Sequence, residues 1–244
     1  LNVFRKFYWK LSDKIFFKIT SPTIATINYL QNIKIFDEKK IFLLRDPVIE
    51  IKKIRELKKE KIDPYFEKNE FIIGIGRLTK QKNFKFLINC FEKLANSNQN
   101  LKLVILGDGE EMKILKKKIV LKKLEDRIFL LGHKQNIFNY LSRAKFFILS
   151  SLWEDPGWVI IEAAACNTLI LSSDCKNGPS EIIEENKAGQ LYKVGSEKDF
   201  INNFNIIINL NKSEIQKKIL FAKKKSYFFS KFQHFNNLEK IINF

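Results

Sequence analysis

The feature that most constrains the fold is a regular alternation of short apolar runs with longer amphipathic stretches, which begins at Phe71. Between the first two apolar runs, the stretch 83–95 has apolar residues at the spacing of one helix face, and the stretches between later runs show the same helical spacing. Strands that alternate with helices at this spacing predict parallel crossovers and a doubly wound α/β sheet, that is, a Rossmann-like domain. The six runs predicted to be strands are 71–76, 101–106, 128–131, 146–149, 169–172 and 190–192.

The segments on either side of this pattern are different in kind. The N-terminal segment resembles two strand–helix units, formed by residues 14–20 and 41–44 with the helix-like stretch 22–31 between them. Two such units are too few for an independent domain of the usual size. A charged stretch, 50–68, follows them and reads as a linker or connecting helix. The pattern after 196 is helical, and fits either the last helices of the domain or a segment that docks on a partner. We therefore expect four parts: 1–48, 49–69, 70–195 and 196–244.

The formal net charge of +17, from 44 basic and 27 acidic residues, favours a polyanionic partner: nucleic acid, an anionic membrane surface or a phosphorylated substrate. The abundance of Lys, Asn, Ile and Phe also fits an AT-rich coding bias, which raises the Lys content without any function. No basic stretch combines with stacking aromatic residues or with a DNA- or RNA-binding motif. Nucleic acid is thus disfavoured, whereas peripheral contact with an anionic leaflet stays open.

The sequence also indicates the compartment. No run reaches the length of an uncharged transmembrane span, and the first ten residues lack the apolar core of a signal peptide. The three cysteines are scattered in mostly apolar settings, and neither they nor the two histidines show the spacing of metal ligands. We therefore expect a cytoplasmic protein without a metal site.

The segment 150–162 contains two carboxylates, Glu154 and Glu162, on either side of a Pro-Gly turn. An apolar strand precedes it and an alanine-rich helix follows, so Gly157 should lie at a helix N-terminus, where free N–H groups favour a phosphate. Glu162 then falls in the first turns of that helix and can face the same cleft as Glu154. Such carboxylates accept hydrogen bonds from ribose or sugar hydroxyls. The alternative is a plain strand–helix junction with one exposed and one salt-bridged Glu.

A second motif, 74–83, follows the first strand. Its glycines allow a close approach to a ligand, and Arg77 and Lys82 supply positive charge, a combination that suits a diphosphate. It lacks the third glycine and the downstream acid of a Rossmann fingerprint, and it is not a Walker A loop. The alternative to a diphosphate site is an ordinary basic loop, without a ligand, on a protein that is basic throughout.

Three weaker motifs follow later strands: Gly107-Asp108-Gly109, Gly132-His133 and the segment 177–181. Each reads mainly as a turn, and we assign His133 no acid–base role. Every motif nevertheless lies at the carboxyl end of a predicted strand, where ligands bind in such sheets. This agreement predicts a ligand site at that edge.

In order and spacing, five motifs together resemble the donor-binding half of the retaining glycosyltransferases of family 4. The resemblance covers 71–194 and implies a GT-B fold, in which 1–48 would be the last units of an N-terminal acceptor domain. The motifs are Gly76-Arg77-Leu78 with Lys82-Asn83, the run 103–109, the run 129–132, Ser150-Ser151 with Glu154 and Glu162-Ala163, and Ser173-Asp174 with Gly178-Pro179 and Glu181-Ile182.

The resemblance implies roles for individual residues. Arg77 and Lys82 would bind the donor diphosphate and stabilise the departing nucleotide, while Glu154 would face the donor sugar and complete the catalytic set. Glu162 would bind the ribose. No metal or cofactor is then needed, because Arg and Lys neutralise the charge. The remaining donor contacts would be Gly76, Gly109, Gly132, Pro156, Gly157, Trp158 and Val159.

The implied reaction is the transfer of a sugar from a nucleotide diphosphate sugar to a glycan or lipid-linked acceptor in cell-surface polysaccharide or lipopolysaccharide synthesis. Members of the family commonly carry Glu-Gly-Phe-Gly where this chain has Asp155 and Pro156 after the first Glu, so the donor sugar is left open. The alternative function is a non-catalytic or partner-dependent sugar-nucleotide-binding module, such as a split or truncated enzyme. Its partner would be a separate N-terminal acceptor domain, and the inner face of the membrane stays open as a further contact.

Overall fold

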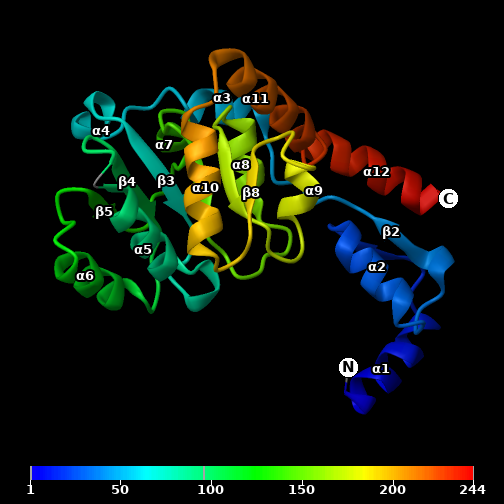
Figure 1. The fold of residues 1–244 in the computed structure, drawn as a ribbon. Helices are drawn as coiled ribbons and strands as arrows, with labels where there is room; N and C mark the ends of the chain where they lie inside the picture. The colour runs from blue at the N-terminus through cyan, green and yellow to red at the C-terminus, as the bar shows by residue number, and fades with distance from the viewer. Residues whose placement is uncertain (1, 96, 244) are drawn as a thin grey trace.

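The computed structural model describes residues 2–95 and 97–243. Its main body is a six-stranded, wholly parallel sheet in the order β5-β4-β3-β6-β7-β8 (Figure 1). The direction of winding reverses between β3 and β6, which confirms the predicted doubly wound α/β sheet. The strands are β3 (Phe71–Ile75), β4 (Lys102–Leu106), β5 (Ile128–Leu130), β6 (Phe147–Leu149), β7 (Ile170–Ser173) and β8 (Gln190–Tyr192).

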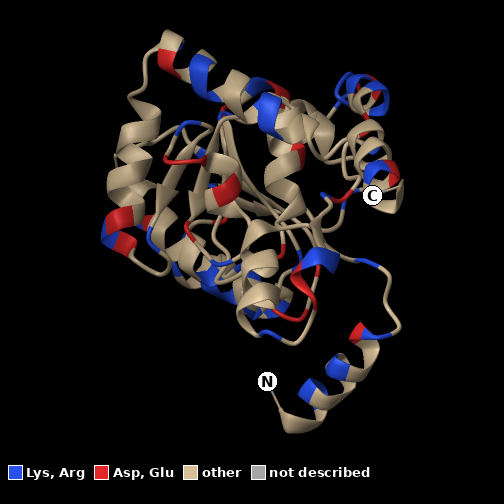
Figure 2. Cartoon of the chain, turned by 90° about the vertical axis from the view of Figure 1, so that its right-hand side faces the viewer, with Lys and Arg blue, Asp and Glu red and all other residues tan. Residues whose placement is uncertain are grey.

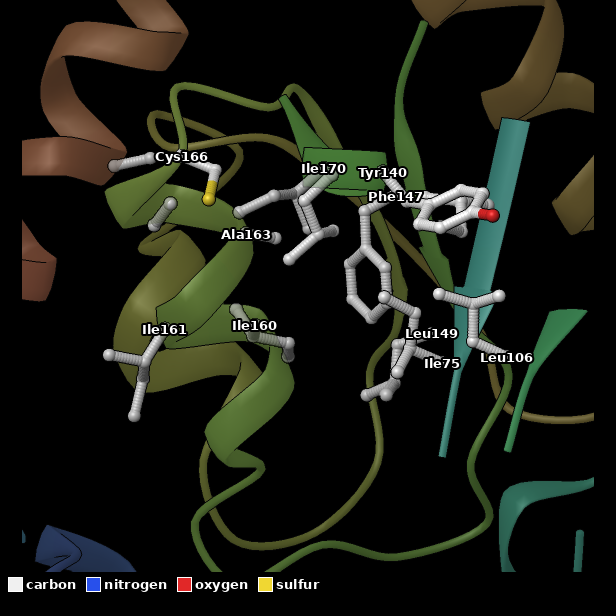
Figure 3. Packing of buried hydrophobic residues seen from close by; sticks show 14 of the residues in the cluster. Ile75, Leu106, Tyr140, Phe147, Leu149, Ile160, Ile161, Ala163, Cys166 and Ile170 are labelled. Atoms are coloured by element: carbon white, nitrogen blue, oxygen red, sulfur yellow. The ribbon is translucent and has the colours of Figure 1, made fainter. Parts of the chain in front are cut away.

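The sheet is buried on both faces, as its continuous apolar strands require. All five residues of β3 are buried, and they alternate between two cores: Ile72 belongs to one cluster and Ile73 to the other. Figure 3 shows the cluster that contains Ile73, in which Ile160 and Ala163 lie beside Phe147. The core therefore consists of two layers with the sheet between them.

Helices cover both layers. The helix α5 forms because its apolar residues recur on one side, where Phe84, Leu87 and Phe91 are buried. It shares its face of the sheet with α6 and α10, and the opposite face carries α7, α8 and α9. These helices are α5 (Phe84–Ala95), α6 (Met112–Leu121), α7 (Phe138–Leu141), α8 (Trp158–Ala165), α9 (Pro179–Ile183) and α10 (Glu197–Ile208), with the short 3-10 turn η2 (Lys80–Lys82) before α5.

A smaller N-terminal unit lies to one side of the main body (Figure 1). Its strands β1 and β2 pair in parallel, with Ile19 opposite Ile41. Its first helix, α1, begins where the Asn2 side chain accepts a hydrogen bond from the Phe4 amide, and none of its residues is buried. The unit comprises α1 (Val3–Asp13), β1 (Ile19–Ser21), α2 (Ile24–Asn32), η1 (Glu38–Lys40) and β2 (Ile41–Leu43).

The linker and the C-terminal tail meet on the main body. The stretch expected as a linker or connecting helix forms two short helices, and the tail, 196–244, forms α10 and two further helices. The Ile49 amide donates to the Phe229 carbonyl at 2.9 Å, and helix α11 packs along α8 with Ala222 fully buried. Helices α10 and α11 of the tail therefore pack on the main body, whereas α12 extends outward from it (Figure 1), with Ile241 alone buried among its described residues. These helices are α3 (Ile51–Leu57), α4 (Pro64–Lys68), α11 (Lys212–Tyr227) and α12 (Lys231–Asn243).

Candidate functional site

The loops after β3 and β4 touch at the carboxyl edge of the sheet, next to the point where the winding reverses. At Gly107, a Cβ atom would lie 1.9 Å from the Gly76 carbonyl oxygen, and the φ angle of +142° also disfavours a side chain. Only glycine permits this backbone contact. Because the two loops are so close, their exposed groups can act on one ligand.

A pocket of about 330 Å³ opens at this edge, near the lower end of the range for small-molecule sites. Its wall combines two cations, one carboxylate and one imidazole with an apolar side. The lining residues are Ile75, Gly76, Arg77, Leu106, Gly107, His133, Lys134, Gln135, Ile137, Phe138 and Glu162.

The carboxylate of Glu162, on α8, is the most perturbed charge of the pocket. Its removal from water raises its pKa from 4.5 to about 7. Among the residues that the structure describes, this carboxylate has no hydrogen-bond or ion-pair partner. A buried carboxylate without a partner costs free energy, which hydroxyl groups of a bound ligand would offset.

A second cluster adjoins the pocket. Lys82 Nζ lies 2.5 Å from Glu154 Oε1, and their side chains are only 13% and 5% exposed. The Ser151 hydroxyl donates to the same Glu154 oxygen at 2.5 Å. A Cβ atom on Gly76 would lie 3.0 Å from Lys82 Cε, so the Lys82 side chain passes over the glycine that lines the pocket. A plain strand–helix junction accounts for the salt-bridged Glu154, but not for Glu162, which is half-buried and without a partner among the described residues.

Gly157 brings the N-terminus of α8 against this cluster. It is the N-cap of the helix, with a left-handed φ of +88°, and a Cβ atom there would lie 3.3 Å from Glu154 Cγ. The free N–H groups of the first turn therefore begin beside the Lys82–Glu154 pair. This location fits the anion-binding role that the sequence predicts for the helix start.

The other predicted donor contacts lie around these two groups. Trp158 is 55% exposed, and its indole Nε1 donates to Asp46 Oδ2 at 3.0 Å. Val159 packs against the core, and Gly109 lies against the backbone of Leu78. The structure thus brings Gly76, Arg77 and Glu162 into the pocket, and Lys82, Glu154 and Gly157 into the cluster. Roles for Trp158, Val159, Pro156, Gly109 and Gly132 in donor binding remain predictions.

Part of the pocket wall was not predicted from the sequence. Lys134, Gln135 and Phe138 follow β5 and reach the same edge as the motifs. Their position directly after a predicted strand could have indicated that they lie at the ligand edge of the sheet. Their residue types, however, form no recognisable motif. His133 lines the wall next to them.

Glu181, from the last motif, attaches the N-terminal unit to the main body. Its carboxylate accepts hydrogen bonds from the amides of Ile24 and Ala25, at 3.1 and 3.0 Å, and from Arg45 Nη1 at 2.8 Å. It therefore caps the start of α2 and forms a largely buried ion pair. Burial raises the pKa of Asp155, and the nearby charges of Asp46 and Glu181 raise it further.

Two features are absent from residues 2–95 and 97–243. No group of three or more His, Cys, Asp or Glu side chains could hold a metal ion. No helix there is long and apolar enough to cross a bilayer.

The sheet order is that of a doubly wound α/β domain, and the basic, carboxylate-lined pocket lies at its switch point. Solved structures share this fold. A glycosyltransferase from Rickettsia africae superposes with a TM-score of 0.82 at 18% identity, covering 99% of this chain and 67% of that one. Staphylococcus aureus TarM, in a mutant complex with UDP, superposes with a TM-score of 0.78 at 23% identity, covering 98% of this chain and 45% of that one.

The family follows from the sequence comparison. The model of the glycosyl transferases group 1 matches residues 55–225, and the chain belongs to this family. A relative from Methanocaldococcus jannaschii, the uncharacterized glycosyltransferase MJ1059, is 35% identical over 182 residues, which are 73% of this chain and 44% of the relative. An N-acetylgalactosaminyltransferase from Campylobacter jejuni that acts on a diphospho-undecaprenol is 35% identical over 133 residues, 53% of this chain and 35% of the relative. The matches thus span less than half of these relatives.

Proposed function

We propose that this chain supplies the donor site of a retaining glycosyltransferase that acts on a glycan or lipid-linked acceptor in cell-surface polysaccharide or lipopolysaccharide synthesis. The observation that carries the proposal is the grouping of Arg77, Lys82 and Glu162 at one sheet edge. Two cations suit a diphosphate, and an unpaired carboxylate suits ribose hydroxyls. A nucleotide diphosphate sugar as donor also fits a cytoplasmic location.

In the proposed reaction, the bond between the anomeric carbon and the diphosphate oxygen breaks, and its electron pair stays with the nucleotide. Arg77 and Lys82 stabilise this negative charge, so the proposal requires no metal. The acceptor hydroxyl attacks the same face of the sugar, and its proton passes to the departing diphosphate oxygen. Glu154 accepts hydrogen bonds from the donor sugar and holds Lys82 at the leaving group.

The relatives support these substrate classes. A Staphylococcus aureus relative, 28% identical over 145 residues, is a poly(ribitol-phosphate) α-N-acetylglucosaminyltransferase. The Campylobacter jejuni relative acts on a lipid-linked glycan. A structural neighbour, Anabaena Alr3699/HepE, is seen in complex with UDP and glucose. A nucleotide sugar and a glycan or lipid-linked acceptor are therefore the substrates that we propose.

Calorimetric titration of the chain with UDP-, GDP- and ADP-sugars tests the donor site. We expect one nucleotide series to bind, and Lys82→Ala and Glu162→Ala each to abolish that binding without unfolding the protein. The matched control is Lys113→Ala, an exposed cation on α6. If both site variants bind like the parent, the donor site is assigned wrongly.

A second candidate is a donor-binding module that needs a partner to position the acceptor. Two features of the N-terminal unit favour it. The sheet of this unit has two strands within the described residues, and the side chains of Phe4, Phe7 and Tyr8 on α1 are each more than 60% exposed. Such a module would bind the nucleotide sugar but would neither hydrolyse nor transfer it. Product formation by the isolated chain in a radiolabelled-sugar assay would exclude this candidate.

A further inference from the structure

A second pocket, of about 320 Å³, lies between α3 and α11, which run together at the top of Figure 1. Its inner wall is formed by the buried residues Ile49 and Ile54. At its mouth, Ile51, Leu220 and Tyr227 are 42%, 55% and 41% exposed. The pocket is therefore an apolar hollow with apolar side chains left in water around it.

Four cations also line the pocket, and no acidic residue is among its described lining residues. Lys58 Nζ donates to the Cys166 carbonyl at 2.8 Å. The charged groups of Arg55, Lys223 and Lys224 have no hydrogen-bond or ion-pair partner within the described parts of the chain. Figure 2 shows basic residues along the helix at the top, α11, in agreement with this charge. Unpaired cations around an apolar hollow complement an anion that carries an apolar part.

The pocket is separate from the donor site. Ala165 and Asn167, at the C-terminal end of α8, contribute to its lining, whereas the donor site adjoins the N-terminal end of the same helix. Eight residues of α-helix separate the two ends by about 12 Å. A ligand in this pocket would therefore leave the donor site open.

We propose that this pocket and its cations form a docking site for a membrane surface of anionic phospholipids. Lipid phosphates contact Arg55, Lys223 and Lys224, and the apolar mouth enters the interfacial layer, where Tyr and aliphatic side chains are favourable. The composition of the site selects this occupant over two others. Nucleic acid would use the cations but not Ile51 or Leu220, and an apolar peptide would not need three unpaired cations.

The experiment is co-sedimentation of the full chain with vesicles of phosphatidylcholine alone or of phosphatidylcholine mixed with phosphatidylglycerol. We expect binding only to the mixed vesicles. A triple variant, Arg55→Gln/Lys223→Gln/Lys224→Gln, should bind them on the order of 100-fold more weakly, because each basic residue near an anionic surface contributes about a factor of five.

Two further variants separate the pocket from the overall charge. A triple variant on α6, Lys113→Gln/Lys116→Gln/Lys117→Gln, removes the same net charge elsewhere and should lose far less affinity. Leu220→Asn keeps the charge and should weaken binding several-fold, because an apolar contact with the interface is lost. Circular dichroism checks that each variant is folded.

Four results would overturn the proposal. The parent could fail to bind the mixed vesicles, or the two triple variants could lose the same affinity, which would indicate net charge alone. Unchanged binding by Leu220→Asn would show that the apolar mouth is not used. A DNA duplex that binds as tightly as the vesicles, with the same sensitivity to the first triple variant, would assign the cations to nucleic acid.

Discussion

Replacing Glu162 with glutamine removes a buried charge but keeps the shape of the side chain. Burial raises the pKa of this carboxyl from 4.5 to about 7, which corresponds to about 3 kcal/mol. Between these two pH values the folded state binds a proton that the unfolded state has released. The stability of the parent protein therefore falls as the pH rises through this window, and it stays low above pH 7.

For Glu162→Gln this penalty disappears. We expect the variant to exceed the parent in stability by about 1 kcal/mol at pH 5 and by about 3 kcal/mol at pH 8. If the carboxylate holds the ribose, the same variant should bind the nucleotide sugar more weakly. Urea unfolding followed by tryptophan fluorescence between pH 5 and 8, with calorimetric titration of the donor, measures both effects.

The stability measurement tests the effect of burial on Glu162, and the affinity measurement tests its contact with the ribose. A stability difference that does not change with pH would show that burial does not disfavour the charged form of Glu162. A gain in stability with unchanged donor affinity would make the residue structural and would remove the ribose assignment. Glu125→Gln, at an exposed position before β5, is the matched control and should show neither effect.

Two further predictions concern the ion pairs that connect distant segments. Lys82→Met should destabilise the protein by about 3 kcal/mol in urea unfolding, since it leaves Glu154 buried without its cation, and adding Glu154→Gln should recover most of the loss. Equal stability of the single and double variants would contradict this. Glu181→Ala should speed hydrogen exchange at the amides of Ile24 and Ala25 but not at Ile73 in β3, and unchanged exchange in α2 would mean that the cap does not hold the N-terminal unit.

The main sheet could be predicted from the sequence because its strands are local features. A central parallel strand is apolar on both faces, so a short apolar run such as 71–75 indicates it without any tertiary information. The helix α5 was equally predictable, because its apolar spacing determines which side is buried. The helix α1 was not predicted, since none of its residues is buried and neither of the two core clusters includes them.

The candidate site was predictable only in part. Features formed by residues close together in the sequence could be predicted, whereas contacts between residues far apart in the sequence could not. Motifs after successive strands indicated the ligand edge, because parallel strands end at the same side of a sheet. The pairing of Lys82 with Glu154, which are 72 residues apart, could not be predicted, since it depends on β3 lying next to β6. The same holds for the contact of Glu181 with the start of α2, across 156 residues and more.

The sequence by itself determined that this chain forms a doubly wound α/β domain, and that its ligand site lies where glycines, basic residues and carboxylates follow the strands. Apolar periodicity and turn chemistry act over a few residues, so they can be read locally. The tertiary structure alone decided that Glu154 is neutralised by Lys82, while Glu162 is half-buried and finds no partner in the part of the chain that the structure describes. Whether a buried charge has a partner depends on which strands and helices become neighbours, and that is a property of the packed chain.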